Sequence, residues 1–338
     1  MDPILGMLST KEPISGERLC EQLGMTRAAV WKRMEKLRAE GYRIVSAGKL
    51  GYRLDPEENS LLPGYLLHEL DTRWAGRGEI AYEAKMDSTN IRAKELARSG
   101  APSGSLALCD QQTAGRGRLQ RRWETPAGVA LTQSLVLRPS LPTEQAQLFT
   151  LAAALAAAGA IAQTCPGLDP GIKWPNDVIL NGKKCVGILS ELAADMDGLS
   201  FVIPGVGINV NQTAFDGELR EKATSLLIEL RKADPNAPPV CRRQLLLSYL
   251  RHMESAVDAL ELLCSELEAA PEAGILNQYV ARSVTLGRRV KVIGLNGEFT
   301  GTAQSIDETG ALIVTEDGGG ERRVLSGDVS VRGLMGYC

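Results

Sequence analysis

Residues that build disulfide frameworks and metal sites are scarce in this 338-residue sequence. It has two histidines, seven scattered cysteines with no C-x-x-C pair, and 4% aromatic residues. We expect neither a disulfide framework nor a zinc site, because both need clustered cysteine or histidine ligands. The sequence also lacks the G-x-G-x-x-G and Walker A motifs, so neither of these common nucleotide-binding loops is predicted.

The sequence has no long hydrophobic run. Its longest apolar stretch, residues 148–162, has 15 residues and includes Thr150, whereas a helix needs about 20 residues to cross a bilayer. Residues 1–13 lack the charged start and the continuous apolar segment of a secretory signal. We therefore predict a cytoplasmic protein with reduced cysteines and no membrane partner.

Acidic side chains exceed basic ones only slightly, 41 against 38, which gives a formal net charge of −3. A uniform attraction to nucleic acid is not expected, so any basic surface must be local. The charges divide unevenly: residues 1–55 hold 10 Lys and Arg against 7 Asp and Glu, and the remainder holds 28 against 34. This distribution predicts a small basic domain followed by an acidic body.

The basic domain has the pattern of three helices followed by a hairpin. Ser15 and Thr26 are predicted to cap helices over 16–23 and 27–40, and Gly24 is predicted to end the first of them. Two short helices joined by a glycine-containing turn, with a basic hairpin behind them, are typical of a winged helix-turn-helix.

We expect this domain to bind DNA through the second helix and the hairpin around residues 48–53. The predicted contacts are basic side chains and two small ones that allow close approach to a groove: Arg27, Ala28, Ala29, Lys32, Arg33, Lys36, Lys49 and Arg53. Trp31, on the same helix, is expected to be a core residue or a minor contact. One domain makes few phosphate contacts, so binding should need a dimer and fall steeply with salt.

The remainder of the chain predicts an α+β fold, with strands grouped around a few long helices. An acidic break containing Pro56 suggests a division into four parts. These parts are a winged helix-turn-helix domain 1–55, a linker and entry segment 56–79, a catalytic body 80–284 and a C-terminal domain 285–338.

Within the body, helices are expected over 144–164 and 241–268, with short strands between residues 171 and 210. The C-terminal part predicts a small antiparallel barrel, because short strands alternate there with glycine-containing turns. Its last strand is expected over 322–331.

The densest chemical signal is segment 115–123, which holds two glycines and four arginines and ends in Trp123. Guanidinium groups and free backbone N–H groups suit a polyphosphate or a phosphoryl–acyl anhydride. Taken alone, the segment could equally be an exposed basic loop. Four other segments add hydroxyl groups, amides, lysines and glycines: 87–90, 173–177, 184–189 and 205–209.

With these motifs in this order and spacing, the chain resembles the biotin protein ligases. The helix-turn-helix in front and the small β-domain behind make it similar to the bacterial bifunctional ligases that also repress the biotin operon. The resemblance implies a biotin/lipoate ligase-like catalytic domain and a C-terminal SH3-like barrel. It also implies that ATP, with Mg²⁺, converts biotin to biotinyl-5′-AMP, and that the biotinyl group passes to a lysine of the biotin carboxyl carrier protein of acetyl-CoA carboxylase.

The resemblance implies roles for the residues that match the motifs of the family. Lys184 and Arg118 are expected to be catalytic, with Lys184 bridging the biotin carboxylate and the α-phosphate. The expected biotin-binding residues are Ser88, Thr89, Asn90, Gln112, Arg116, Gly117, Arg118 and Lys184. The expected ATP- and adenylate-binding residues are Gly115, Arg121, Trp123, Asn176 and Asn209. No metal-ligating side chains are assigned; Asp177 would orient Lys184 or a metal ion, or would only cap its turn.

The chain departs from the family pattern at Leu119 and Gln120, which stand where the family has an arginine and a glycine. The change bears on the ordering of the loop, on retention of the adenylate, and on the homodimer that the adenylate is expected to favour. Three alternatives stay open: a lipoate-type ligase, a ligand-responsive transcription factor with an inactive ligase domain, and a ligase whose N-terminal domain only docks and does not bind DNA.

Overall fold

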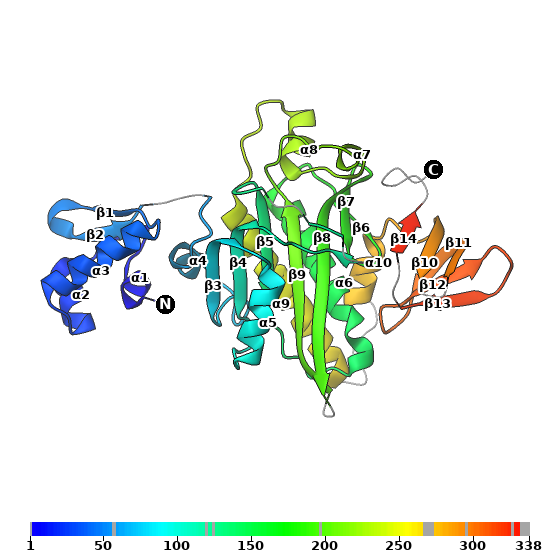
Figure 1. Cartoon of the computed structure of the whole chain (residues 1–338), viewed down its shortest axis with the longest axis horizontal. Helices are drawn as coiled ribbons and strands as arrows, with labels where there is room; N and C mark the ends of the chain where they lie inside the picture. The colour runs from blue at the N-terminus through cyan, green and yellow to red at the C-terminus, as the bar shows by residue number, and fades with distance from the viewer. Residues whose placement is uncertain are drawn as a thin grey trace. The chain divides into compact units, whose positions relative to one another are not determined.

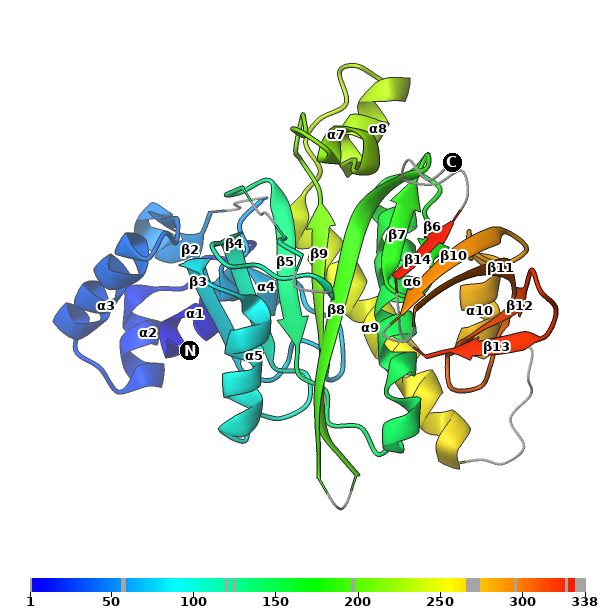
Figure 2. The ribbon, with the colours of Figure 1, turned by 45° about the vertical axis from the view of Figure 1, so that its right-hand side comes forward.

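The computed structural model of the chain describes residues 2–55, 59–118, 121–123, 126–195, 198–265, 274–294, 297–325 and 328–331. The chain divides into two compact units, whose helices and strands are drawn in Figures 1 and 2. Unit 1 comprises Met1–Asp71 and Cys241–Arg243, and unit 2 comprises Thr72–Val240 and Gln244–Cys338.

The described part of unit 1 has the helices and the hairpin that the sequence predicts. Its elements are α1 (Pro3–Met7), α2 (Gly16–Leu23), α3 (Arg27–Ala39), β1 (Ile44–Ser46), the 3-10 turn η1 (Gly48–Leu50), β2 (Tyr52–Leu54) and α4 (Pro63–Glu69). Both predicted caps are confirmed: Ser15 Oγ accepts a hydrogen bond from Arg18 N, and Thr26 Oγ1 accepts one from Ala29 N. Gly24 ends α2 with a left-handed φ of 61°, which glycine adopts without strain.

Helix α4 lies in the segment 56–79, which the sequence predicts to be a linker. Tyr65 on this helix is fully buried in the hydrophobic core of unit 1. Its hydroxyl accepts a hydrogen bond from Arg43 N at 3.0 Å. Residues 59–71 therefore fold with unit 1 instead of forming a linker, because Tyr65 and the neighbouring Leu61 and Leu66 are buried.

A mixed seven-stranded sheet forms the centre of unit 2, as the α+β prediction requires. The strand order is β3-β4-β5-β9-β8-β7-β6. The strands are β3 (Ile80–Met86), β4 (Leu106–Gln112), β5 (Ala130–Leu135), β6 (Gly171–Lys173), β7 (Asp177–Leu180), β8 (Lys183–Asp195) and β9 (Gly198–Asn209). β8 and β9 have 13 and 12 residues, so the prediction of short strands is wrong here. Lys184 and Asn209 lie at the same end of this long hairpin.

Helix α6 is the apolar stretch noted in the sequence. Residues Thr143–Thr164 are long and apolar enough to cross a membrane by length and composition alone, but 72% of that window is buried in the structure. The helix packs against β8 and β9, as a core helix does. The helices of unit 2 are α5 (Thr89–Arg98), η3 (Thr143–Gln145), α6 (Gln147–Thr164), α7 (Leu219–Lys222), α8 (Leu226–Ala233), α9 (Arg242–Ser265, whose first two residues belong to unit 1) and α10 (Ile275–Ala281).

The C-terminal part of unit 2 is an antiparallel sheet of five strands in the order β13-β12-β11-β10-β14. The strands are β10 (Arg289–Gly294), β11 (Gly297–Ile306), β12 (Leu312–Glu316), β13 (Glu321–Val324) and β14 (Asp328–Val331). The segment predicted as one strand over 322–331 supplies both outer strands of this sheet, so that prediction is wrong. Trp174 joins the sheet to the centre of unit 2: its buried Nε1 donates a hydrogen bond to Gly310 O at 3.0 Å.

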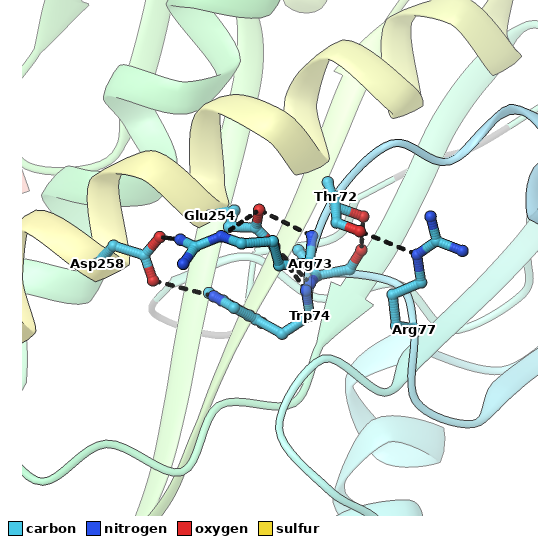
Figure 3. Close-up of polar contacts among 7 residues, drawn as sticks. Thr72, Arg73, Trp74, Arg77, Glu254 and Asp258 are labelled. Carbon is cyan, nitrogen blue, oxygen red and sulfur yellow. Dashed lines mark hydrogen bonds and ion pairs between the residues drawn. The ribbon is translucent and has the colours of Figure 1, made fainter.

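A turn after Thr72 opens unit 2 and is held by α9 (Figure 3). Glu254 accepts hydrogen bonds from the backbone N–H groups of Arg73, Trp74 and Ala75 at 3.0, 2.7 and 3.1 Å. Burial acts to raise the pKa of Glu254, but these bonds and the guanidinium of Arg73 outweigh it and hold the pKa below its ordinary value. The carboxylate therefore fixes the chain entry into unit 2.

Candidate functional site

A cavity of about 550 Å³ opens at one end of the central sheet of unit 2. The start of α5, the loop 115–123, the strands β7 to β9, the segment 215–223 and β14 all contribute to its walls. Almost every residue that the sequence assigns to biotin or nucleotide lines it: Ser88, Thr89, Asn90, Gln112, Arg116, Gly117, Arg118, Arg121, Trp123, Asn176, Lys184 and Asn209. Gly115 is buried behind the lining. The sheet thus brings together five segments that are far apart in sequence.

One wall of the cavity consists of neutral hydroxyl and amide groups. Gln112 Oε1 accepts hydrogen bonds from the backbone N and the Oγ1 of Thr89 at 2.9 and 3.2 Å. Ser134, on β5, lies behind this wall with its Oγ 2.8 Å from Thr89 Oγ1. Ser88 is buried at the start of α5. Such a wall can orient an uncharged polar ring through hydrogen bonds of fixed direction.

Asn90 supports this wall from behind. Its Nδ2 donates to Leu189 O at 3.1 Å and to Glu191 Oε2 at 2.7 Å, and a Cβ on Gly205 would lie 1.8 Å from its Oδ1. Both amide hydrogens are therefore used within the protein, whereas the sequence assigns Asn90 to direct biotin contact. Ser134 and Glu191 were not identified from the sequence, because only strand pairing brings them to α5.

Lys184 and Asp177 form an ion pair in the cavity, with Nζ 2.5 Å from Oδ1. Lys173 Nζ lies 4.0 Å from the other carboxylate oxygen, and all three side chains are at least 74% buried, with exposed fractions of 26%, 13% and 12% for Lys184, Asp177 and Lys173. One carboxylate thus faces two lysines, and Arg116, Arg118 and Arg121 line the same cavity. The excess of positive charge suits an anionic ligand.

The described residues of the loop 115–123 form a narrow hairpin over the cavity. Gly117 N donates to Arg121 O at 2.7 Å, and Trp123 N donates to Gly115 O at 3.0 Å. Arg118 Nη1 donates to the side-chain oxygen of Asn176 at 3.3 Å. Leu119 and Gln120, where the chain departs from the family pattern, lie outside the described residues.

The indole of Trp123 lies against two glycines. A Cβ on Gly207 would lie 2.4 Å from Trp123 Cε2, and one on Gly187 would lie 2.9 Å from Cζ3. Lys184 Nζ is 5.8 Å from the centroid of the ring. Trp123 Nε1 is buried and has no hydrogen-bond partner among the residues that the structure describes. The ring can therefore offer a flat face to a bound heterocycle.

The segment 215–223 closes part of the cavity and was not identified from the sequence. Phe215, Leu219 and Lys222 line the cavity. The segment is fastened at Thr224, whose backbone N donates to Lys184 O at 2.9 Å and whose backbone O accepts from Asn209 Nδ2 at 3.1 Å. No motif marks these residues, because their place depends on pairing with a strand some 40 residues earlier.

The predicted DNA-contact residues of unit 1 divide into exposed and internally paired ones. Arg27, Ala28, Lys32, Lys36 and Lys49 are exposed, and Ala29 is partly buried. Arg33 forms an ion pair with Asp2 at 2.8 Å, and Arg53 forms one with Asp55 at 3.6 Å.

Trp31 is 60% exposed. Of its two expected roles, a core residue or a minor contact, the core role is therefore wrong. Trp31 lines a hollow of about 290 Å³ between α3 and the hairpin, together with Arg27 and Lys49. Arg38, near the end of α3, is half-buried and donates hydrogen bonds to Ile44 O at 3.0 and 2.9 Å.

Three family models cover most of the chain. Residues 82–209 match the biotin/lipoate A/B protein ligase family, residues 3–53 match a helix-turn-helix (HTH) domain, and residues 285–332 match the biotin protein ligase C terminal domain. A biotin protein ligase from Aquifex aeolicus, solved in complex with biotin and ATP, superposes with a TM-score of 0.59 at 27% identity, covering 75% of this chain and 98% of that one. The fold and the site therefore define a ligase joined to a helix-turn-helix domain.

Similarity over nearly the whole chain identifies the group more narrowly. The bifunctional ligase/repressor BirA of Bacillus subtilis is 35% identical over 95% of this chain and 94% of that protein. BirA of Escherichia coli is 30% identical over 93% and 92%. The chain belongs to the biotin protein ligase family, and its three-part organisation is that of the bifunctional ligase/repressors.

Proposed function

We propose that the chain activates biotin with ATP as biotinyl-5′-AMP and transfers the biotinyl group to one lysine of a biotin carboxyl carrier protein, such as that of acetyl-CoA carboxylase. The observation that carries the proposal is the Lys184–Asp177 ion pair in a cation-rich cavity, between the neutral wall at Thr89 and the ring of Trp123. A relative 35% identical over 75% of this chain is named biotin–[acetyl-CoA-carboxylase] ligase, which supports the choice of acceptor.

In the first step, a carboxylate oxygen of biotin forms a bond to the α-phosphorus of ATP. The bond between that phosphorus and the oxygen bridging to the β-phosphate breaks, and pyrophosphate leaves with the electron pair. Biotin is ionised at neutral pH, so no proton moves and no general base is needed. The barrier is the approach of two anions, and Lys184 with Arg118 would lower it by neutralising both.

In the second step, the neutral ε-amino nitrogen of the carrier lysine attacks the acyl carbon of the adenylate. The bond from that carbon to the phosphate oxygen breaks, AMP leaves, and the nitrogen loses one proton as the amide forms. The adenylate is reactive towards water and stray amines, so the loop 115–123 and the segment 215–223 would protect it by excluding both.

We assign the neutral wall to the ureido ring of biotin and the opposite side to the nucleotide. Ser88, Thr89 and Gln112 would bind the ring, with Asn90 holding them in place, and Arg116 and Gly117 would close over it. Trp123 would stack on adenine, with Gly115, Arg121, Asn176 and Asn209 shaping the phosphate and ribose side.

Mg²⁺ fits this site as an ion that arrives with ATP. Among the described residues, no group of three or more His, Cys, Asp or Glu side chains could hold a metal ion. The carboxylates that line the cavity are Asp177 and Glu218, and one or two carboxylates are what Mg²⁺ uses when phosphates supply the other oxygens. When bound, Mg²⁺ supplies further charge neutralisation at the phosphates.

The proposal is tested by intact mass spectrometry of an apo carrier domain incubated with the protein, biotin, ATP and Mg²⁺. We expect the addition of one biotinyl group, and a rate at least about 100-fold lower for Lys184→Ala, because one charge-neutralising group is lost. The control is Lys291→Ala, a lysine in the C-terminal sheet whose Nζ pairs with Glu298. An unmodified carrier with the wild-type chain would contradict the proposal.

The same experiment separates the alternatives. Replacing biotin by lipoate should leave the carrier unmodified; modification with lipoate would favour the lipoate-type ligase. Binding of biotin and ATP without transfer would favour a transcription factor that only senses these ligands. The presence of Lys184 and Arg118 in the cavity supports an active ligase over such a sensor, while the departure from the family pattern at Leu119 and Gln120 keeps the sensor open as an alternative.

We further propose that unit 1 binds operator DNA and represses biotin synthesis genes when the adenylate is bound and the chain is a homodimer. The exposed side chains of Arg27, Lys32 and Lys49 support this surface, and the relatives named ligase/repressor support the role. We place the protein in the cytoplasm, where carrier proteins and operators are found together.

A further inference from the structure

We propose that Glu229, outside the cavity, is a positioning residue that fixes the catalytic Lys184 by clamping the two segments on either side of its backbone. Glu229 lies on α8 (Leu226–Ala233) and is not among the residues that line the cavity. The inference deepens the proposed ligase function and rests on it, because it concerns the rate of biotin activation.

Glu229 is a fully buried carboxylate, with an exposed side-chain fraction of 0%. Asn181 Nδ2 donates to Oε2 at 2.6 Å, and Thr224 Oγ1 donates to Oε1 at 2.5 Å. Lys232 Nζ donates to both oxygens at 2.7 Å. A buried charge is costly unless it is paired and hydrogen-bonded. Moving any of the three partners away from Glu229 would therefore be unfavourable, and this keeps all three in place.

The first partner, Asn181, controls the entry into β8. It is the non-glycine residue with a positive φ, 48°, in the described part of the chain, and with Gly182 it forms the turn from β7 to β8. Lys184 is the second residue after this turn and the second residue of β8. The β7–β8 ladder then shifts register, since Ile179 pairs with Lys184 while Val178 pairs with Val186. Such a bulge changes the direction of nearby side chains, so the turn geometry decides where Lys184 points.

The second partner, Thr224, controls the other side of Lys184. Its backbone N donates to Lys184 O at 2.9 Å, and its backbone O accepts from Asn209 Nδ2 at 3.1 Å. The hydroxyl that Glu229 holds belongs to this same residue. One carboxylate thus fixes the turn before Lys184 and the strand segment beside it, and a displacement of about 1 Å at a reacting group can cost about 100-fold in rate.

Only a carboxylate satisfies all of these donors. Burial acts to raise the pKa of Glu229, but hydrogen bonds from Lys232, Thr224 and Asn181 outweigh it and hold the pKa below its ordinary value. A glutamine of the same shape has one acceptor oxygen, and its NH₂ group would face a donor. Glu229→Gln therefore loosens the clamp without emptying the space.

The test measures biotin-dependent pyrophosphate release by the full chain. We expect Glu229→Gln to lower kcat about 10- to 100-fold and to leave the KM for biotin within about twofold, since the neutral wall at Thr89 is untouched. Glu144→Gln, the same substitution at an exposed glutamate in η3, is the matched control and should leave kcat unchanged. Loss of biotin affinity together with kcat would indicate general damage and overturn the inference.

A double-mutant cycle distinguishes positioning from folding. If Glu229 acts through Lys184, the Lys184→Ala/Glu229→Gln double variant should be about as active as Lys184→Ala alone. If the fold-losses of activity caused by the two single substitutions multiply in the double variant, the inference is overturned. Asn181→Gly, which keeps the positive φ and removes one donor, provides a second variant if Glu229→Gln does not fold, and it should lower kcat in the same direction. An inactive wild-type chain would instead contradict the proposed function itself.

Discussion

Single residues decide how closely the walls of the cavity approach one another. Trp123 can lie flat against β8 and β9 because Gly187 and Gly207 carry no side chain. Asn90 reaches Leu189 O across the sheet because Gly205 leaves room for it. These glycines are needed for close packing against side chains, which glycine permits because it has no Cβ.

Gly207→Ala should displace the ring of Trp123, because the new Cβ would lie 2.4 Å from Cε2. We expect ATP affinity to fall at least about 10-fold, as one aromatic stacking surface is lost, with biotin affinity nearly unchanged. Isothermal titration with each ligand measures both affinities.

The matched control for this prediction is Gly318→Ala, since a Cβ there meets nothing within 4 Å. In a Trp123→Ala background, Gly207→Ala should have little further effect on ATP affinity, because the ring it displaces is gone. An equal loss of ATP affinity with and without Trp123 would show that the explanation is wrong.

At the scale of elements, buried carboxylates fasten turns to helices. Glu254 on α9 holds the turn at 73–75, and Glu229 on α8 holds the turn at Asn181. Each carboxylate accepts hydrogen bonds from donor groups in a turn that have no acceptor within a helix or strand. Helices α8 and α9 therefore each fix a turn that lies outside them in the chain.

Glu254→Gln should lower the free energy of unfolding of unit 2 by about 1.5–3 kcal/mol, the range for hydrogen bonds to a charged group. The pKa of Glu254 is held below the ordinary value of 4.5, so the folded state binds this proton less readily than the unfolded state. The stabilisation is therefore complete above that value and is lost as pH falls through the lowered pKa.

Urea unfolding at about pH 7 and about pH 3 checks this prediction. The difference between wild type and Glu254→Gln should be large at the higher pH and small at the lower one. Glu144→Gln, at an exposed glutamate in η3, should show no such difference. An unfolding difference that is the same at both pH values would contradict the role assigned to Glu254.

At the scale of the whole molecule, DNA binding and catalysis belong to different compact units. Reversing the charge of Arg27 and Lys32 together should weaken operator binding about 10- to 100-fold and reduce its salt dependence, because phosphate contacts are lost. Ligase activity should be unchanged. Fluorescence anisotropy over a salt series measures the first effect, and carrier biotinylation measures the second.

The control for charge alone is Arg98→Glu/Arg288→Glu, which reverses two exposed arginines of unit 2. This variant should bind DNA as the wild type does. If both double variants lose affinity equally, a general effect of net charge accounts for the loss, and the surface on α3 does not.

Adenylate and DNA should also affect one another's binding. If biotinyl-5′-AMP tightens operator binding by some factor, operator DNA must tighten adenylate binding by the same factor, since the two share one thermodynamic cycle. Titrations of adenylate with and without DNA measure this factor. Equal adenylate affinities under both conditions would rule out adenylate-dependent repression.

The sequence by itself determined the features that depend on neighbouring residues. The caps at Ser15 and Thr26 and the turn at Gly24 follow from hydrogen bonds that span three or four residues. The motifs around Lys184, Arg118 and Trp123 named most of the cavity lining, because their order and spacing carried the family resemblance that assigned roles to them. The α+β class followed from the alternation of apolar patterns.

Only the tertiary structure decided what depends on contacts between distant segments. It joined residues 59–71 to unit 1, exposed Trp31, hydrogen-bonded Asn90 to Leu189 and Glu191, and brought the segment 215–223 and Glu229 to Lys184. Each of these outcomes is set by which strands pair and which side chains are buried together. Such contacts join residues far apart in the chain, so no local pattern of residues specifies them.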